Sequence, residues 1–164
     1  MLRVVLMGVS GCGKSSVGEA LSELLAVPYV DGDDLHPAAN VAKMAAGIAL
    51  NDNDRWPWLD RVADVLSDSA PVIVGCSALK HIYRDHIRAR AGGRVRFVHL
   101  AGSRDQIAAR IAQRDSHYMP LSLLESQFAT LEAPGSDEAQ TVDIAHPTKV
   151  LAEMIAASLR NTGD

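Results

Sequence analysis

Short apolar runs alternate with longer segments of helical periodicity along the 164-residue chain. Val-rich runs bounded by Gly, Pro or Asp predict strands at 2–7, 27–30, 72–74, 95–100 and 141–144. Between these runs, apolar residues such as Val17, Leu21 and Leu24 recur at the spacing of an amphipathic helix. Because parallel strands need crossover connections, this alternation predicts an α/β fold: a parallel five-stranded sheet between two helical layers, α/β/α.

The rest of the chain divides into further helices and loops. Helical spacing recurs at Ile107 and Ile111 and again from Val150 to Leu159. The alanine-rich segments 37–49 and 87–91 also favour helix. Loops are expected at 31–36, 47–54, 92–93, 116–120 and 133–138. At roughly 150 residues per domain, the length predicts one domain spanning 1–164.

Composition restricts the function without identifying it. Lys and Arg number 16 against 20 Asp and Glu, a net charge of −4, which excludes a nucleic-acid binder that works through a broad basic face. Cys12 and Cys76 make no disulfide framework, which indicates a reducing compartment. No apolar run approaches the roughly 18 residues of a membrane span. We therefore expect a cytoplasmic protein without nucleic-acid or membrane partners.

A phosphate-binding loop follows the first predicted strand. Residues 8–15 read GVSGCGKS and match G-x-x-x-x-G-K-S at every fixed position, with a helical pattern directly after them. In such a loop the backbone N–H groups point at phosphate oxygens, the Lys reaches the β/γ-phosphates and the Ser hydroxyl binds Mg²⁺. The predicted nucleotide-binding residues are Gly8, Val9, Ser10, Gly11, Cys12, Gly13, Lys14, Ser15 and Ser16, with Lys14 also catalytic and Ser15 a ligand of Mg²⁺. The alternative is a Gly/Ser turn that only caps a helix.

The loop alone does not identify the reaction, because kinases, GTPases and motor ATPases share it. The chain contains no N-K-x-D tetrapeptide of the kind that reads guanine in GTPases, and it is short for a motor ATPase. The residues that would bind an acceptor must therefore distinguish between these classes of enzyme.

Three carboxylates, Asp31, Asp33 and Asp34, follow the second predicted strand. In open α/β sheets, ligands bind outside the carboxyl ends of the strands. Asp31 and Asp33 can face the same side of an extended segment. We predict that Asp33 orients or deprotonates an acceptor hydroxyl and that Asp31 or Asp33 supports Mg²⁺ through water. A helix N-cap is the alternative for Asp33 and for Asp34.

Polar residues further along provide candidate ligands for a hydroxylated, anionic acceptor. His36, Asn40 and Lys43 share one helical face, although a solvated face is the alternative for Lys43. Arg55 can bind both oxygens of a carboxylate. Lys80 and Arg84, at i and i+4, predict a two-cation face for the same carboxylate.

Several nearby residues also have structural interpretations. Asp54 is expected to cap the next helix with Pro57 in its first turn. Trp58 either forms a wall of the pocket or packs in the core, which is the more common position for tryptophan. Ser77 either binds substrate or caps a helix, and His81 is expected at the surface.

Four blocks of the sequence resemble the gluconate kinase (gluconokinase) family, whose members are related to shikimate and adenylate kinases. The blocks are MGVSGCGKSS at 7–16, DGDDLHPAANVAKMAAGIALNDNDRWPWL at 31–59, CSALKHIYRD at 76–85 and QFATLEAPG at 127–135. The resemblance implies a phosphate-loop NTPase fold with a mobile lid at about 110–125 and an acceptor-binding segment at about 31–60. It also implies transfer of the γ-phosphoryl group of ATP to the 6-hydroxyl of D-gluconate, giving 6-phospho-D-gluconate. Homodimers are common in the family.

The resemblance extends to residues near the lid and the chain end. Arg110 and Arg114 are implied to close over the phosphates and to assist catalysis, with a solvated helix face as the alternative. His117 and Gln127 are further candidates for the substrate, with a plain loop position as the alternative for His117. Pro147 is placed by chain order at the adenine end of ATP. At the end of the third strand, where many phosphate-loop enzymes carry an Asp, the chain has residues 75–77, GCS. This departure, shared with the family, shifts support of the metal to Asp31 and Asp33.

The same residues are also compatible with other activities. A shikimate-like or nucleoside monophosphate kinase is the alternative enzyme, because shikimate is also a hydroxylated carboxylate. A module that binds ATP without turnover is a further alternative, and it would not need Asp33, Lys80 and Arg84.

Overall fold

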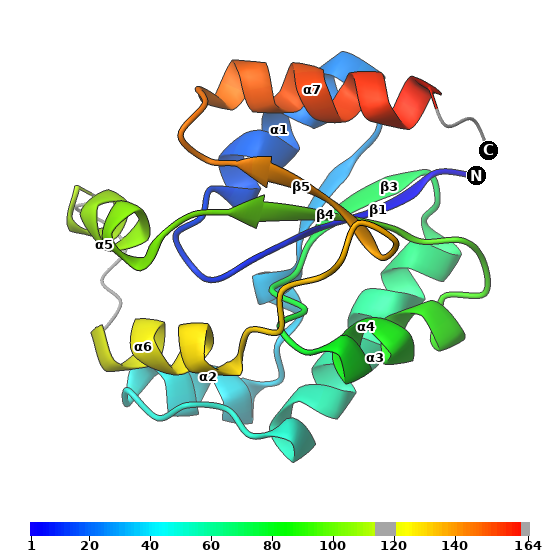
Figure 1. Ribbon diagram of the computed structural model, residues 1–164. Helices are drawn as coiled ribbons and strands as arrows, with labels where there is room; N and C mark the ends of the chain where they lie inside the picture. Colours follow the sequence, from blue (N-terminus) through cyan, green and yellow to red (C-terminus); the bar gives the residue numbers. More distant parts are fainter. Residues whose placement is uncertain (114–120, 162–164) are drawn as a thin grey trace.

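The computed structural model describes residues 1–113 and 121–161 and is built around a five-stranded sheet (Figure 1). The strands are β1 (Arg3–Met7), β2 (Tyr29–Asp31), β3 (Val72–Gly75), β4 (Arg96–Ala101) and β5 (Ala139–Asp143). Their order is β2-β3-β1-β4-β5, and every neighbouring pair is parallel. All five predicted strands are thus confirmed, with ends displaced by at most two residues.

Helices cover both faces of the sheet, which confirms the three-layer prediction. They are α1 (Lys14–Leu25), α2 (Ala38–Ala45), α3 (Asp52–Asp68), α4 (His81–Arg90), α5 (Arg104–Ala112), α6 (Leu121–Thr130) and α7 (Thr148–Asn161), with a short 3-10 helix, η1 (Gly32–Leu35). Helices α1 and α7 pack together on one face, and α3 and α4 pack together on the other (Figure 1). Within the described residues, none of the helices has the length and apolar character needed to cross a membrane.

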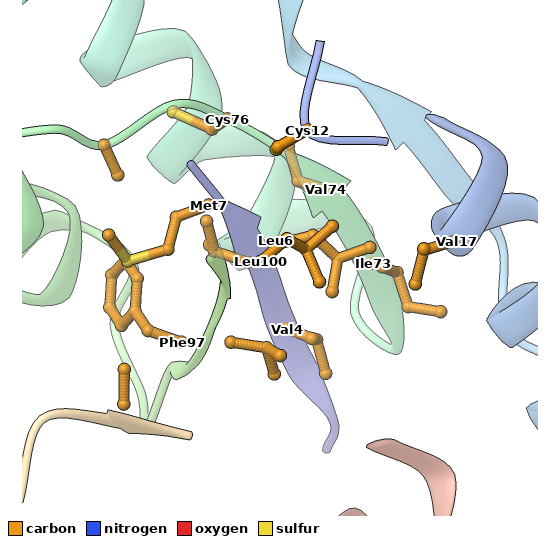
Figure 2. Close-up of a cluster of buried hydrophobic side chains, with 14 of the residues drawn as sticks. Val4, Leu6, Met7, Cys12, Val17, Ile73, Val74, Cys76, Phe97 and Leu100 are labelled. Carbon is orange, nitrogen blue, oxygen red and sulfur yellow. The ribbon is translucent and has the colours of Figure 1, made fainter. Parts of the chain in front are cut away.

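The core is centred on β1. Val4, Val5, Leu6 and Met7 are fully buried, because β3 and β4 flank this strand and helices cover both of its faces. Figure 2 shows Val4 and Leu6 among side chains of β3 and β4. With few aromatic residues available, most of the core is aliphatic, and both cysteines are free and buried within it.

The parallel strands bring three loops to one edge of the sheet. β1 leads into the phosphate loop, and Gly8 N donates to Ser77 O beyond β3 at 3.2 Å. β2 ends at Asp31, which pairs with Gly75. The next residue is glycine for a steric reason, since a Cβ on Gly32 would lie 2.2 Å from Gly75 O. The predicted phosphate loop, acceptor carboxylates and Ser77 therefore share this edge.

The start of α3 differs from the prediction. The helix begins at Asp52, inside the expected loop 47–54, and its N-cap is Asn51 rather than Asp54. Asn51 Oδ1 accepts from Asp54 N at 2.8 Å and Asp54 Oδ2 accepts from Asn51 N at 2.9 Å, a reciprocal capping box. Pro57 consequently lies in the second turn of the helix, not the first.

Candidate functional site

The phosphate loop has the backbone conformation that its glycines predict. Gly8, Gly11 and Gly13 have φ angles of 144°, 84° and 101°, a region that residues with a side chain rarely adopt. Gly13 is also the N-cap of α1. Lys14 Nζ lies within the loop, where it donates to Gly8 O at 2.9 Å and Val9 O at 3.1 Å. Loop, lysine and helix N-terminus are therefore arranged to hold a phosphate chain.

The remaining loop residues have different surroundings. Cys12 is fully buried, with its Sγ 3.7 Å from Lys14 Nζ. Ser15 and Ser16 are exposed on the first turn of α1. The thiol of Cys12 therefore fills space under the loop, as a small apolar side chain would.

Ser15 and Asp31 form the candidate metal site. Ser15 Oγ donates to Asp31 Oδ2 at 3.3 Å, and Asp31 Oδ1 accepts from Asp33 N at 2.9 Å. Asp31 therefore caps η1, and the alternative of a cap at Asp33 or Asp34 is wrong. A hydroxyl and a carboxylate beside a phosphate loop are the oxygen donors that Mg²⁺ takes together with substrate phosphates, so these residues fit the ion.

A pocket of about 370 Å³ opens beside the phosphate loop, within the size range of small-molecule sites. Its lining comes from the loop, η1, α2, α3, α6 and the segment after β3. The polar residues of the lining are Ser10, Lys14, Asp33, His36, Arg55, Ser77, Ser126 and Gln127. Apolar lining residues include Val41, Met44, Leu50, Trp58, Leu79 and Leu123. One small polar molecule can thus lie against Lys14 and Asp33 together.

Asp33 is the carboxylate of this pocket. Its side chain is exposed to the concave space, where surrounding protein atoms replace much of its water. This desolvation raises the pKa of Asp33, Lys14 opposes the rise, and Asp31 and Asp34 add to it. The position suits a group that takes a proton from an acceptor hydroxyl.

His36 and Trp58 form one wall of the pocket. Their rings stack at a centroid separation of 4.1 Å, and Trp58 Nε1 donates to Gly32 O at 2.8 Å. Trp58 is 2% exposed, so it is both a core residue and a pocket wall. Burial and the nearby Arg55 charge lower the pKa of His36 to about 4, so the ring is neutral at pH 7.

Asn40 and Lys43 do not line the pocket, contrary to the prediction. Asn40 is 3% exposed, and its Nδ2 donates to Asp54 O at 2.8 Å and contacts His36 Nδ1 at 3.1 Å. The amide thus leaves the His36 proton on Nε2. Lys43 pairs with Asp54 at 2.8 Å. Both residues fasten α2 to the start of α3, and of the predicted polar face only His36 reaches the pocket.

Arg55 is the pocket cation on the acceptor side. It is 8% exposed, and its Nη1 donates to Tyr83 Oη at 2.8 Å. The guanidinium carbon lies 5.3 Å from the centre of the Tyr83 ring. Tyr83 was not singled out from the sequence, although it belongs to the CSALKHIYRD block that carries the family resemblance.

The predicted two-cation face of Lys80 and Arg84 is wrong. Arg84 is 1% exposed and donates to Ala78 O, Leu79 O, Glu132 O and the Glu138 carboxylate. Lys80 pairs with Asp52 at 3.0 Å in a groove next to the pocket rather than in its lining. The spacing placed both cations on one helical stretch, but Arg84 is directed into the protein.

Ser77 and Gln127 both line the pocket, as expected. Ser77 does not cap α4, because that helix begins at His81, whose N–H donates to Glu132 Oε1 at 2.8 Å. Gln127 Oε1 accepts from Ser10 N at 2.7 Å, and its Nε2 donates to Ser10 Oγ at 2.9 Å. Helix α6 is thereby fastened directly to the phosphate loop.

Arg110 contacts the phosphate loop but does not line the acceptor pocket. Its guanidinium donates to Cys12 O at 3.4 Å and to Ile144 O. It therefore joins the phosphate loop to the segment after β5, which contains the exposed Pro147. Arg114 and His117 lie outside the described residues.

Sequence comparison identifies the family. The chain matches the model of the AAA domain family over residues 4–134. It is 41% identical over 167 residues to the thermosensitive gluconokinase of Escherichia coli K12, covering 96% of this chain and 89% of that protein. The chain belongs to the gluconokinase family. The family expected from the four sequence blocks is thereby confirmed.

Solved structures agree with this gluconokinase assignment. The crystal structure of a gluconokinase from Sinorhizobium meliloti 1021 is 44% identical, with a TM-score of 0.86 and coverage of 99% of this chain and 98% of that one. A shikimate kinase from Bacteroides thetaiotaomicron is 17% identical, with a TM-score of 0.67 over 97% of this chain and 98% of that one. The second likeness shows the fold alone and confirms the predicted kinase-type architecture.

Proposed function

We propose that the protein transfers the γ-phosphoryl group of ATP to the 6-hydroxyl of D-gluconate, giving 6-phospho-D-gluconate and ADP. The observation that carries the proposal is a single pocket that holds Lys14 of the phosphate loop, the carboxylate of Asp33 and the guanidinium of Arg55. Similarity to proteins named gluconokinase supports the same reaction. The segment 31–60 supplies much of the acceptor side of this pocket.

The phosphate loop would bind ATP through its backbone N–H groups and Lys14 Nζ. Ser15 Oγ and Asp31 Oδ2, 3.3 Å apart, would hold Mg²⁺, which neutralises charge on the β- and γ-phosphates when bound. Arg110 contacts the same loop at Cys12 O and would add positive charge near it. These roles are compatible with the residues present.

Asp33 would act on the acceptor hydroxyl. The hydroxyl oxygen of the acceptor forms a new bond to the γ-phosphorus, the bond from that phosphorus to the β–γ bridging oxygen breaks, and ADP leaves with the electron pair. The acceptor proton passes to Asp33. A carboxylate whose pKa is raised by desolvation is a better base for this proton than an ordinary exposed Asp.

The acceptor would lie with its carboxylate near Arg55 and its chain along the polar wall. Arg55 offers a planar pair of donors to both carboxylate oxygens. His36 Nε2–H, Ser77 and Gln127 can hydrogen-bond the hydroxyl groups of an open-chain polyol. The apolar residues of α2 and α6 cover the carbon chain.

A coupled ADP-release assay tests this proposal. Purified protein with Mg²⁺ and ATP is given D-gluconate, shikimate or a nucleoside monophosphate, and the product is identified by its phosphorus NMR signal. We expect ADP release only with gluconate and phosphate on its 6-oxygen. Turnover of shikimate or of the nucleotide without turnover of gluconate would replace the proposal, and ATP binding without any acceptor turnover would indicate a binding module.

Three further expectations stay predictions. They are the lid at about 110–125, which includes residues outside the described part of the chain, the homodimer and the cytoplasmic location. None of the residue roles proposed above depends on them.

A further inference from the structure

Tyr83 is placed to control the geometry of Arg55. It is 1% exposed on α4, and its ring packs edge-on against Trp56 at 5.7 Å. Its hydroxyl accepts a hydrogen bond from Arg55 Nη1 at 2.8 Å and donates one to Asp52 Oδ1. The tyrosine therefore stands between the pocket cation and a carboxylate at the start of α3.

The directions of these hydrogen bonds follow from the groups involved. A guanidinium can only donate, so the Tyr83 oxygen must accept from Arg55, and its single hydrogen goes to Asp52. Lys80 Nζ donates to the same Asp52 oxygen at 3.0 Å. The carboxylate is thus held from two sides, and Tyr83 presents a lone pair to Arg55 in one fixed direction.

Arg55 uses one of its five N–H groups on this bond. It lines both the pocket beside the phosphate loop and the adjoining groove that contains Lys80 and Asp52. The tyrosine bond thus fixes a long side chain that would otherwise choose among several rotamers at that boundary. A fixed guanidinium loses less conformational entropy when it binds a carboxylate.

We propose that Tyr83 is a positioning residue that holds the Arg55 guanidinium in the orientation that binds the acceptor carboxylate, with Asp52 and Lys80 fixing the tyrosine hydroxyl. The inference deepens the proposed function and rests on it. Tyr83 itself does not line the pocket, so its effect on acceptor binding passes through Arg55.

Calorimetric titration with D-gluconate tests the inference through a double-mutant cycle of Tyr83→Phe and Arg55→Lys. We expect Tyr83→Phe to weaken gluconate binding about tenfold, the effect of losing one hydrogen bond to a charged group. Binding of ATP should change less than about twofold, since Tyr83 does not line the pocket and its hydrogen bonds go to Arg55 and Asp52. In the Arg55→Lys background, Tyr83→Phe should cause no further loss, because the oriented guanidinium is already gone.

Asp52→Ala provides a second variant should Tyr83→Phe fold poorly, with Asn53→Ala, an exposed residue of the same turn, as its matched control. Asp52→Ala should weaken gluconate binding and Asn53→Ala should not. Additive effects in the cycle, equal weakening of gluconate and ATP, or unchanged gluconate binding in both Tyr83→Phe and Asp52→Ala would overturn the inference. Failure of the unaltered protein to bind gluconate would instead overturn the proposed function.

Discussion

Asp33 experiences opposing electrostatic influences within the pocket. Desolvation raises its pKa while Lys14 lowers it, so the carboxylate is basic and still close to a cation. We expect Asp33→Asn to lower kcat by roughly 10²- to 10⁴-fold, the range for loss of a general base. The KM for ATP should change little. The same change at the exposed neighbour Asp34 is the control, and a near-normal kcat in Asp33→Asn would remove the proposed role.

His36 gives the pocket a pH-dependent stability. Its pKa is lowered to about 4 in the folded protein, whereas an unfolded histidine has a pKa near 6.5. Between these values the unfolded chain binds more protons, so stability falls as pH falls from about 6.5 toward 4. His36 therefore contributes to the loss of stability over this window.

Denaturant unfolding at pH 7.5 and pH 4.5 measures this effect. His36→Gln should lose less stability between the two pH values than the unaltered protein does, because glutamine does not titrate. His146→Gln, at an exposed position, is the matched control. Equal losses in His36→Gln and the unaltered protein would show that His36 does not carry the effect.

Sequence spacing predicted which residues lie near the site better than it predicted the directions of their side chains. Lys14, Asp33 and Arg55 reach the pocket as predicted. Asn40 and Arg84 do not, because both are buried, with Asn40 bonded to Asp54 O and the His36 ring and Arg84 bonded to backbone carbonyls and Glu138. A helical interval shows that two residues share a face, but only packing decides whether that face meets a pocket or the core.

At the scale of elements, α6 and the phosphate loop act as one unit through Gln127 and Ser10. The reciprocal hydrogen bonds of 2.7 and 2.9 Å hold the loop backbone in place. Gln127→Leu should therefore raise the KM for ATP about tenfold, since a backbone N–H near the phosphates loses its fixed partner. Gln113→Leu, at an exposed position after α5, should leave the KM unchanged. Steady-state kinetics against ATP decide between these outcomes.

The junction of β2 and β3 permits no side chain at Gly32. An added Cβ would lie 2.2 Å from Gly75 O, so the two strands would have to separate. We expect Gly32→Ala to lower the free energy of unfolding by about 1–3 kcal/mol, the usual cost of overpacking. Gly92→Ala, where a Cβ meets its nearest atom at 3.7 Å but φ is +72°, gives the cost of backbone strain alone. Denaturant titration of both variants checks this, and a Gly32→Ala protein of unchanged stability would contradict it.

The strands were the most predictable elements, because each is a short Val-rich run with a turn residue at its end. The start of α3 could not be predicted correctly, because four successive positions hold several good capping residues: Asn51, Asp52 and Asp54. The choice between them depends on tertiary contacts such as Lys43 with Asp54, which local sequence does not contain.

At the scale of the whole molecule, Arg84 joins segments that are distant in sequence. Its bonds reach the residues before α4 and, through Glu132 and Glu138, the connection between α6 and β5. Arg84→Ala should destabilise the protein by about 3–5 kcal/mol, because it removes the buried partner of Glu138 and leaves the buried carbonyl oxygens around it without their donor. It should not raise the KM for gluconate selectively.

Arg88 offers a matched control, since it contacts the same Glu138 carboxylate at 3.3 Å but is 31% exposed. Arg88→Ala should cost less than about 1 kcal/mol. Thermal and denaturant unfolding of the two variants test the difference, and similar losses would show that the buried contacts of Arg84 stabilise the protein no more than the exposed pair of Arg88 does.

The net charge of −4 did not reveal the charge of the site. Lys14 and Arg55 line the pocket, while Asp31 at the end of β2 and Asp33 in η1 oppose their charge. The excess of acidic residues lies elsewhere on the chain. Family blocks, rather than composition, allowed the site to be predicted.

The central position of β1 has a consequence for how the protein is made. Its hydrogen-bonded neighbours, β3 and β4, begin at Val72 and Arg96, so β1 is synthesised before both of them and has no lateral partner until that part of the chain follows. The phosphate loop also lacks its hydrogen bond from Ser10 N to Gln127 until α6 has been synthesised. Long loops must close before these contacts form, which slows folding. We expect a nascent chain that stops before α6 to lack an ordered nucleotide site, although the residues of its loop are synthesised well before that helix.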